Sequence, residues 1–294
     1  MKRTITCLVV VVAFVVLVII SNTTSESASG KSDLKVDVMV KDMVAARHSR
    51  TQMQYLTKTY GDFSIDEAYQ IQLVLAKQVS RELGPVVGYK VAYASKAAQE
   101  QFGVDEPASA PLFELQRVPS GTTLREAAFM EIVLETEVAF TIGRRIDRPI
   151  KDVAEMKTCV KWVHTAFDIG DYRFVKGDAP PSAADMIASG IGAHFFMLGP
   201  AVEPNKVDVD AVDLVLKRDG EVISKSPASN VMGSPWNSLF WCVNHIVKLV
   251  GVLEPGTVIV SGTAAPAYKV KGEKIKGNYT GECGPLGGVT LTIE

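Results

Sequence analysis

Two carboxylates, Glu135 and Glu137, stand inside the otherwise apolar run of residues 131 to 142. The β-branched and aromatic residues of this run predict a strand, and because strand side chains alternate, both carboxylates point to the same face. Two buried like charges are costly without a cation near them. Either this face meets water or a positive ion lies between the carboxylates, and their spacing alone leaves both interpretations open.

Two further groups could complete a reactive site. Asp168 follows a segment expected to be helical, Val153 to Thr165, after which a strand could carry it inward. Three carboxylates from two elements would suit Mg²⁺, Mn²⁺ or Ca²⁺ rather than zinc. Lys90 lies mid-strand between apolar neighbours, where it either extends its ammonium to water or sits in a site that lowers its pKa for proton transfer. Asp105 could orient that lysine or cap a turn.

The elements that must position these groups change character along the chain. Residues 34 to 81 predict helices, with a capping box from Ser64 to Glu67, and Gly84 with Pro85 ends this part. A later helix is predicted from Trp236 to Val250. Strands are predicted at Val86 to Ala94, Ile132 to Ile142, His194 to Leu198, Val212 to Lys217, Thr257 to Val260 and Val289 to Ile293.

Strands and helices do not alternate regularly in the later two thirds of the chain, which argues against a parallel doubly wound sheet. The sequence therefore predicts an α+β fold, in which a helical N-terminal region (31–84) joins a mixed β domain (85–294). With 294 residues, a net charge of −2 and no basic stripe, the chain gives no indication of nucleic-acid binding, which leaves small molecules and proteins as its expected partners. Beyond Cys7 it has three cysteines without Cys-x-x-Cys spacing, which is typical of neither a disulfide scaffold nor a zinc site.

The first thirty residues are of a different kind. Lys2 and Arg3 precede an unbroken apolar run from Cys7 to Ile20, and small polar residues follow up to Gly30. This order predicts a secretory signal peptide, and an uncleaved membrane anchor is the alternative. At 1.5 Å per residue the run spans roughly 21 Å, short of the roughly 30 Å of a bilayer core. We therefore expect a secreted or periplasmic protein, attached to a membrane only if this segment is retained.

Six short motifs follow one another along the chain: Gly88 to Lys90, Val104 to Pro107, Leu134 to Phe140, Ala166 to Asp168, Asp185 to Ser189 and Ser261 to Thr263. In this order and spacing they resemble the 2-oxopent-4-enoate (2-keto-4-pentenoate) hydratase and 4-oxalocrotonate decarboxylase branch of the fumarylacetoacetate hydrolase superfamily. The resemblance extends from about Ile65 to the C-terminus. It implies a mixed β-roll or sandwich core and a homo-oligomer.

The resemblance also implies roles for individual residues. A divalent ion, Mg²⁺ or Mn²⁺, would be held by Glu135, Glu137 and Asp168. Lys90, with Asp105 beside it, would act as acid and base, and the substrate site would include Tyr89, Ser189 and Thr263. Two departures stand out: Asp168 occupies a position where hydratases of this branch more often carry glutamate, and the stretch from Asp185 to Ser189 lacks the asparagine that the family tends to have.

The activity implied is a metal-dependent hydratase that converts a 2-hydroxy-2,4-dienoate to a 4-hydroxy-2-oxoacid. Relatives that hydrolyse carbon–carbon bonds carry a histidine shortly after the position of Asp105, and this chain has no histidine between His48 and His164. Hydration or decarboxylation is therefore favoured over hydrolysis. The alternatives are a 4-oxalocrotonate-type decarboxylase and an exported, catalytically inactive binding protein with the same fold.

Overall fold

The computed structural model describes residues 34–263, 265, 268–269 and 275–294. The predicted signal peptide or anchor, residues 1–30, lies outside the described residues. Within the described ranges, no helix combines the length and the apolar character needed to cross a membrane.

The N-terminal region is helical, as predicted, and it packs directly on the sheet. Residues 34–49 form a helix, followed by α2 (Leu56–Tyr60) and α3 (Ile65–Leu83). The capping box is present: the Ser64 side chain accepts a hydrogen bond from the backbone N–H of Glu67, whose carboxylate accepts one from the Ser64 N–H. Apolar residues along α3 pack in one core with α6 (Ala183–Ala188) and β2 (Ala108–Phe113).

Two sheets form the rest of the molecule. The larger has seven strands in the order β2-β1-β9-β4-β5-β6, with β10 beside β4, and the smaller has five in the order β3-β12-β11-β7-β8. The strands of the larger sheet are β1 (Val86–Ala92), β2, β4 (Ile132–Ile142), β5 (Val160–Asp171), β6 (Phe195–Leu198), β9 (Val258–Val260) and β10 (Tyr268–Lys269). Those of the smaller sheet are β3 (Thr122–Leu124), β7 (Asp213–Arg218), β8 (Glu221–Pro227), β11 (Gly277–Glu282) and β12 (Gly288–Ile293).

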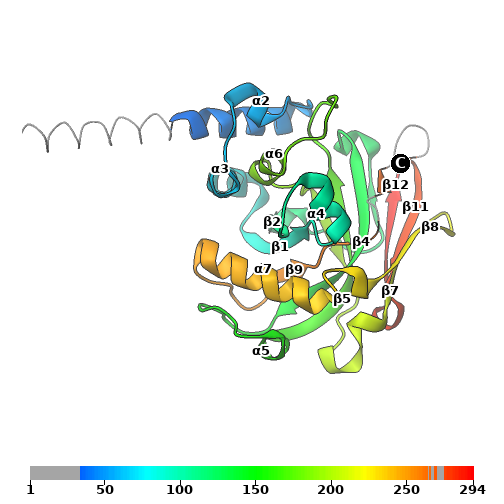
Figure 1. Cartoon of the computed structure of the whole chain (residues 1–294). Coiled ribbons are helices and arrows are strands. Elements are labelled where there is room, and N and C mark those ends of the chain that lie inside the picture. The colour runs from blue at the N-terminus through cyan, green and yellow to red at the C-terminus, as the bar shows by residue number, and fades with distance from the viewer. Residues whose placement is uncertain (1–33, 264, 266–267, 270–274) are drawn as a thin grey trace, which may run out of the picture.

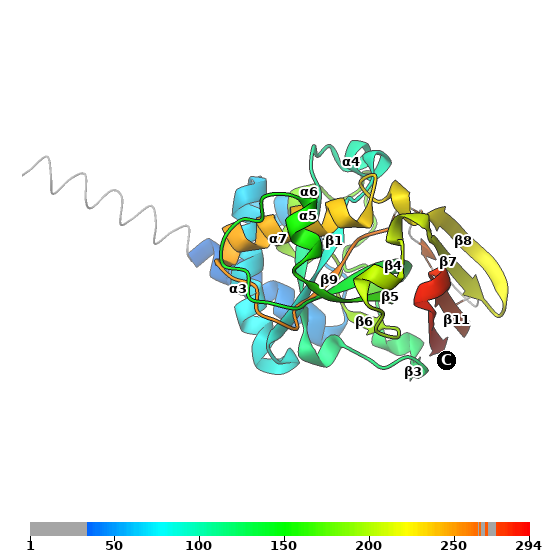
Figure 2. The same cartoon turned by 90° about the horizontal axis from the view of Figure 1, so that it is seen from below.

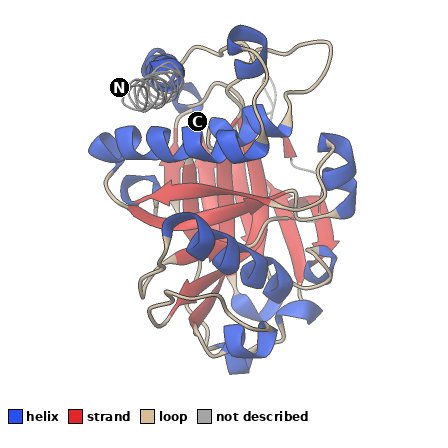
Figure 3. Cartoon of the chain, turned by 60° about the vertical axis from the view of Figure 1, so that its left-hand side comes forward, coloured by secondary structure: helices blue, strands red, loops and turns tan. Residues whose placement is uncertain are grey.

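Helices cover the larger sheet, and the smaller sheet lies to one side of it (Figure 1). The remaining helices are α4 (Lys96–Phe102), α5 (Val153–Lys157) and α7 (Pro235–Val250). Figure 3 shows helices on two opposite sides of the strands, and Figure 2 places the C-terminus at the smaller sheet. Buried residues of β4 and β5 pack against β7, β11 and β12, so the two long strands β4 and β5 are covered by helices on one side and by a second sheet on the other. The predicted α+β class with a mixed sandwich-like core is confirmed.

One predicted element is wrong in part. The segment from Val153 to Thr165 was expected to be one helix, but α5 ends at Lys157 and β5 begins at Val160. Nine consecutive residues of β5, from Val163 to Asp171, are buried, because both faces of the strand are covered. The apolar and polar alternation that would have indicated a strand is therefore missing there. This strand is the one that carries Asp168.

Candidate active site

The pairing of β4 with β5 brings the carboxylates together. The strands are antiparallel, and their register sets Glu135 directly opposite Asp168, with Glu137 two positions further along β4. Side chains that are directly opposite lie on the same face, as do those two positions apart. One carboxylate oxygen from each of Glu135, Glu137 and Asp168 lies within 4.8 Å of the others. The carboxylate pair therefore does not form a wet strand face but belongs to a cluster of three.

The cluster fits a divalent cation. Glu137 and Asp168 are 0% and 1% exposed, and each has one oxygen, Oε1 and Oδ1 respectively, that is buried without a hydrogen-bond partner among the residues that the structure describes. An unsatisfied buried carboxylate oxygen carries a large desolvation cost unless a cation or a donor meets it. Three carboxylates form an all-oxygen donor set of the kind that Mg²⁺, Mn²⁺ and Ca²⁺ accept.

Lys90 is the one basic residue of β1 (Val86–Ala92), and its ammonium faces the carboxylate cluster. It is 5% exposed, and its ammonium forms an ion pair and hydrogen bond with Asp168 Oδ2. Burial alone would lower the pKa of Lys90, but the charges of Asp168 and Glu135 outweigh it and hold the pKa above its ordinary value. The lowered pKa considered for Lys90 is therefore wrong for the metal-free protein. A cation bound to the same carboxylates would oppose the lysine charge and move this pKa down.

The pKa values of two of the carboxylates are raised as well. Burial raises the pKa of Glu135 to about 7, an effect that Lys90 opposes and Asp168 strengthens. Burial raises the pKa of Glu137 well above its usual range, and the charges of Asp168 and Glu135 add to this. Without a metal ion the cluster therefore holds protons at neutral pH.

Metal affinity is accordingly expected to rise between pH 6 and pH 8, because a proton must leave before the ion can bind. Each proton released makes the affinity rise by up to about tenfold per pH unit. Calorimetric titration of Mn²⁺ into the metal-free protein at pH 6, 7 and 8 measures the affinity. Repeating it in buffers of different ionisation enthalpy measures the number of protons released. An affinity that does not change over this range, with no proton release, would contradict the raised pKa values.

The same protons give the metal-free protein a pH-dependent stability. A carboxylate whose folded-state pKa is raised stabilises the fold fully below its unfolded pKa of about 4.3, and this contribution is lost as pH rises through the folded pKa. Urea denaturation in EDTA should therefore show lower stability at pH 8 than at pH 5.5. The loss amounts to at most about 1.4 kcal/mol per pH unit for each proton. Saturating Mg²⁺ should reduce the difference, because the ion replaces the protons.

Gly262 holds Glu137 in place from the loop that follows β9. Its backbone N–H donates a hydrogen bond of 2.5 Å to Glu137 Oε2. Its φ of +83° favours glycine, and a Cβ here would lie 2.6 Å from the Cβ of Ala94. The loop can therefore reach the carboxylate only with glycine at this position.

Replacing Gly262 by alanine should weaken metal binding as well as destabilise the fold. The crowded Cβ must push the loop away, at a cost of about 1–3 kcal/mol. Gly256→Ala is a matched control, because Gly256 also has a positive φ (+91°) but open space around its Cβ position. Chemical denaturation and Mn²⁺ titration of both variants test this. Equal metal affinity in the two variants would show that the loop does not position Glu137.

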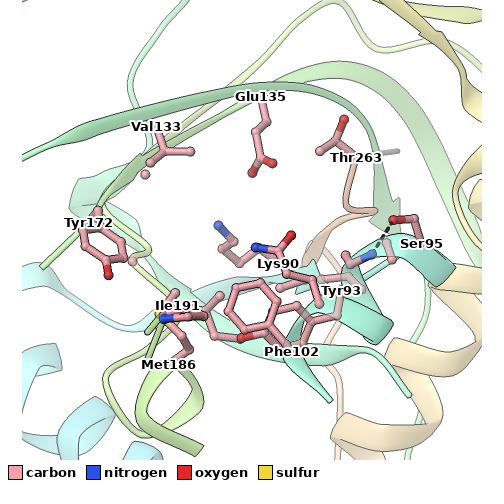
Figure 4. A pocket seen from close by; sticks show the side chains of 18 of the residues that line it. Lys90, Tyr93, Ser95, Phe102, Val133, Glu135, Tyr172, Met186, Ile191 and Thr263 are labelled. Atoms are coloured by element: carbon pink, nitrogen blue, oxygen red, sulfur yellow. Dashed lines mark hydrogen bonds between the residues drawn. The ribbon is translucent and has the colours of Figure 1, made fainter. Parts of the chain in front are cut away.

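A cavity of about 520 Å³ opens beside the cluster. Lys90 and Glu135 border it, and Figure 4 shows both side chains directed into the same space. The wall opposite Glu135 is apolar and aromatic, and is formed by Tyr93, Phe102, Met186 and Ile191. Tyr93 and Ile191 adopt φ values of +56° and +49°, which are rare for an aromatic and for a β-branched residue. Backbone strain of this kind is concentrated at binding and catalytic sites.

Of the other predicted site residues, one lines the cavity and three lie elsewhere. Thr263 lines the cavity. Tyr89 lies on the opposite face of β1 from Lys90 and packs in the core with α7 and β4. Asp105 is exposed on a bend before β2 and does not line the cavity. Ser189 is buried at the end of α6, where its hydroxyl donates to the carbonyl of Met186, 3.0 Å away. The structure thus brings together Lys90, Thr263 and the three carboxylates, but not Tyr89, Asp105 or Ser189.

The Asp185 carboxylate has a structural role, because its hydrogen bonds connect two helices. Its carboxylate accepts hydrogen bonds from the backbone N–H of Thr57 at 2.8 Å and from Ser182, whose hydroxyl lies 2.7 Å away. Asp185 is fully buried and therefore joins α2 to the start of α6. Because α6 carries Met186, this carboxylate fixes part of the cavity wall.

The fold and this site define a member of a known enzyme family. The family described as fumarylacetoacetate (FAA) hydrolase, C-terminal, matches residues 85–282, and the chain belongs to it. The chain is 27% identical over 232 residues to a 2-keto-4-pentenoate hydratase of Paraburkholderia xenovorans (strain LB400), covering 79% of this chain and 86% of that protein. It is 24% identical over 225 residues to a 2-hydroxyhexa-2,4-dienoate hydratase of Comamonas testosteroni, covering 76% and 84%.

A solved structure shares the fold over nearly its whole length. The 4-oxalocrotonate decarboxylase from Pseudomonas putida G7, complexed with magnesium and adipate, superposes with a TM-score of 0.83. The superposition covers 89% of this chain and 98% of that one, at 19% sequence identity. The predicted family and branch are confirmed.

The apolar wall was not predicted from the sequence. Phe102 and Met186 lie on the short helices α4 and α6, where no chemical motif marks them. One signal was present: Tyr93 follows Lys90 by three residues, within the predicted strand and just beyond the end of β1.

Proposed function

We propose that this protein is a metal-dependent hydratase that adds water to a 2-hydroxy-2,4-dienoate to give a 4-hydroxy-2-oxoacid. The observation that supports it best is the cluster of three carboxylates, two of them buried, with the buried Lys90 beside a cavity of about 520 Å³. The hydratases among its relatives share most of the chain's length. The metal would be Mg²⁺ or Mn²⁺, held by Glu135, Glu137 and Asp168.

In the proposed mechanism Glu135, Glu137 and Asp168 would hold the ion, which would supply Lewis acidity at the carboxylate end of the substrate. Lys90 Nζ moves the proton that converts the dienol to its 2-oxo-enoate form, and water then adds to the far carbon of the conjugated system. The Gly262 N–H keeps Glu137 oriented throughout. The apolar wall restricts water around the substrate, which strengthens the electrostatic interactions at the reacting end.

The cavity favours a substrate with a single carboxylate. Among its described lining residues Lys90 is the one cationic side chain, and it faces the carboxylate cluster. The second carboxylate of a dicarboxylic substrate would meet Tyr93, Phe102, Met186 and Ile191 without a counter-charge from the described part of the wall, which is costly. We therefore place hydration ahead of 4-oxalocrotonate-type decarboxylation.

The direct test incubates the purified protein with 2-hydroxypenta-2,4-dienoate, with and without Mg²⁺, and follows the loss of dienol absorbance. The expected result is metal-dependent loss with formation of 4-hydroxy-2-oxopentanoate, and little or no CO₂ release from 4-oxalocrotonate. Faster decarboxylation than hydration would reverse the order of the two activities. If neither substrate is consumed although Mn²⁺ binds tightly, the protein is better described as an inactive binding protein.

We also propose that the protein is exported and forms a homo-oligomer. Export rests on the charged, apolar and polar order of residues 1–30, and oligomerisation rests on family resemblance. Mass spectrometry of the natural N-terminus would detect cleavage, and light scattering would give the assembly mass. An intact N-terminus in a cytosolic fraction, or a monomeric mass, would contradict the respective proposal.

A further inference from the structure

A second cavity, of about 240 Å³, lies away from the carboxylate cluster. It is bordered by the end of the helix over residues 34–49, the later part of α3, the end of β5, and His194 with Phe195. At the end of β5 and just beyond it, Gly170 and Tyr172 line the first cavity, while Arg173 lines the second. Asp171 borders both cavities. The second cavity plays no part in the proposed reaction.

Three arginines line this cavity: Arg47, Arg50 and Arg173. Arg173 is 5% exposed, and its guanidinium donates to two neutral backbone carbonyls, those of Ser189 at 3.4 Å and Ala193 at 2.5 Å. Its nearest carboxylate, Asp171, is 4.0 Å away. A buried guanidinium held mainly by carbonyls keeps much of its charge uncompensated.

The acidic side chains of the wall are already engaged. Asp171 Oδ1 accepts hydrogen bonds from the backbone N–H groups of Met130, at 2.7 Å, and Glu131, at 3.0 Å. Glu82 pairs with His48 at 2.8 Å. Three arginines against Asp171 and Glu82 leave one positive charge in excess, even with the histidines counted as neutral.

The neighbouring groups respond to this positive charge. Burial and the charge of Arg47 lower the pKa of Arg173 to about 9. Burial lowers the pKa of His194 to about 3, and the charges of Arg173, Arg47 and Arg50 contribute to this. All three arginines therefore lower the pKa of the same group, the His194 imidazole on the cavity wall. A bound anion would relieve their mutual repulsion.

We propose that this cavity is a binding site for a small oxyanion, of the phosphate or dicarboxylate class. The planar guanidinium of arginine pairs with two oxygens of such an anion. Of the other two arginines on the cavity wall, Arg50 is exposed and Arg47 is half-buried. The anion would supply the missing negative charge next to Arg173. Because Asp171 borders both cavities, the site lies directly behind the strand that carries Asp168.

The test is calorimetric titration of inorganic phosphate into the full-length protein in EDTA, with NaCl holding the ionic strength constant. EDTA prevents phosphate from binding through a metal ion at the carboxylate cluster. We expect saturable binding of one phosphate per chain, weakened at least about tenfold by Arg47→Gln, since hydrogen bonds between charged groups contribute about 1.5–3 kcal/mol. Arg81→Gln is the matched control: it removes the same charge from an exposed position on α3 that does not line the cavity.

Two further sets of titrations identify the class of anion and provide a second variant in case the first one does not fold. Sulfate and succinate in place of phosphate distinguish a general oxyanion site from one that requires a phosphate. Arg50→Gln, at an exposed position, repeats the test should Arg47→Gln lose cooperative unfolding. The proposal is overturned by the absence of saturable binding of any of the three anions, or by equal affinities in the cavity and control variants. A second copy of the chain is the alternative occupant, because it could place an acidic residue in the cavity. The proposal is therefore also overturned if the unmodified protein binds no anion and Arg47→Gln lowers the assembly mass.

Discussion

Replacing Glu137 by glutamine is expected to abolish metal-dependent turnover without destabilising the fold. Glu137 is fully buried, and one of its oxygens has no hydrogen-bond partner in the described part of the chain. Changing a partner that only touches a metal ligand costs about 10–100-fold in affinity or activity, so loss of a ligand should cost more than 100-fold in Mn²⁺ affinity. Stability in EDTA should stay equal or rise, because a neutral amide replaces an acid that is costly to ionise when buried, and the amide oxygen can still accept from Gly262.

Glu282→Gln serves as the control for this experiment. It removes one carboxylate from β11, where Glu282 pairs with Lys217 on the smaller sheet, and should leave Mn²⁺ affinity and turnover unchanged. Titration of Mn²⁺, dienoate turnover and urea denaturation in EDTA are compared across the two variants. If Glu137→Gln bound Mn²⁺ as tightly as the unmodified protein, Glu137 would not be a ligand.

Replacing Lys90 by methionine should separate metal binding from proton transfer. Methionine has a similar length but carries no proton, so kcat should fall by about 10²–10⁴-fold, the usual contribution of a positioned acid or base. Mn²⁺ affinity should be unchanged or higher, because the ion no longer competes with an ammonium for Asp168. In EDTA the variant should lose about 3 kcal/mol of stability, since Asp168 stays buried without its partner. Mg²⁺ should recover much of that loss.

Lys96→Met is the matched control for Lys90. It removes the same charge from an exposed position at the start of α4, close in the chain but outside the cavity lining. A drop in kcat shared by both variants would indicate a general effect of charge. A loss of Mn²⁺ binding in Lys90→Met would mean that the lysine organises the carboxylates and does not act as the proton carrier.

Much of the fold could be predicted because local signals coincided with it. The Ser64 capping box opens α3, and Ile132 to Ile142 were placed as a strand at the bounds that the structure has. β2 was missed, and the first half of β5 was predicted as helix, for a shared physical reason: every residue of β2 and nine consecutive residues of β5 are buried, so neither strand alternates. β2 also contains Pro111, which normally argues against a strand.

Site residues were predicted correctly where their spacing along a strand fixes which way the side chains point, and they were missed where no such spacing exists. Glu135 and Glu137 had to share a face because they stand two positions apart on one strand. Asp105 was placed beside Lys90 by motif order alone, and the structure puts it on an exposed bend. The cavity wall comes from short helices and from loop residues such as Tyr93 and Ile191, whose positive φ values no sequence pattern announced.

The carboxylates and the cavity wall belong to different parts of the molecule. Glu135 and Asp168 are fixed by cross-strand register in the middle of the two longest strands, whereas Phe102 and Met186 sit on helices of seven and six residues. Substitutions in these short helices can reshape the wall without shifting the strand register. A lineage with this architecture could therefore exchange one substrate tail for another by a few changes in α4 and α6 while the reactive centre is inherited intact.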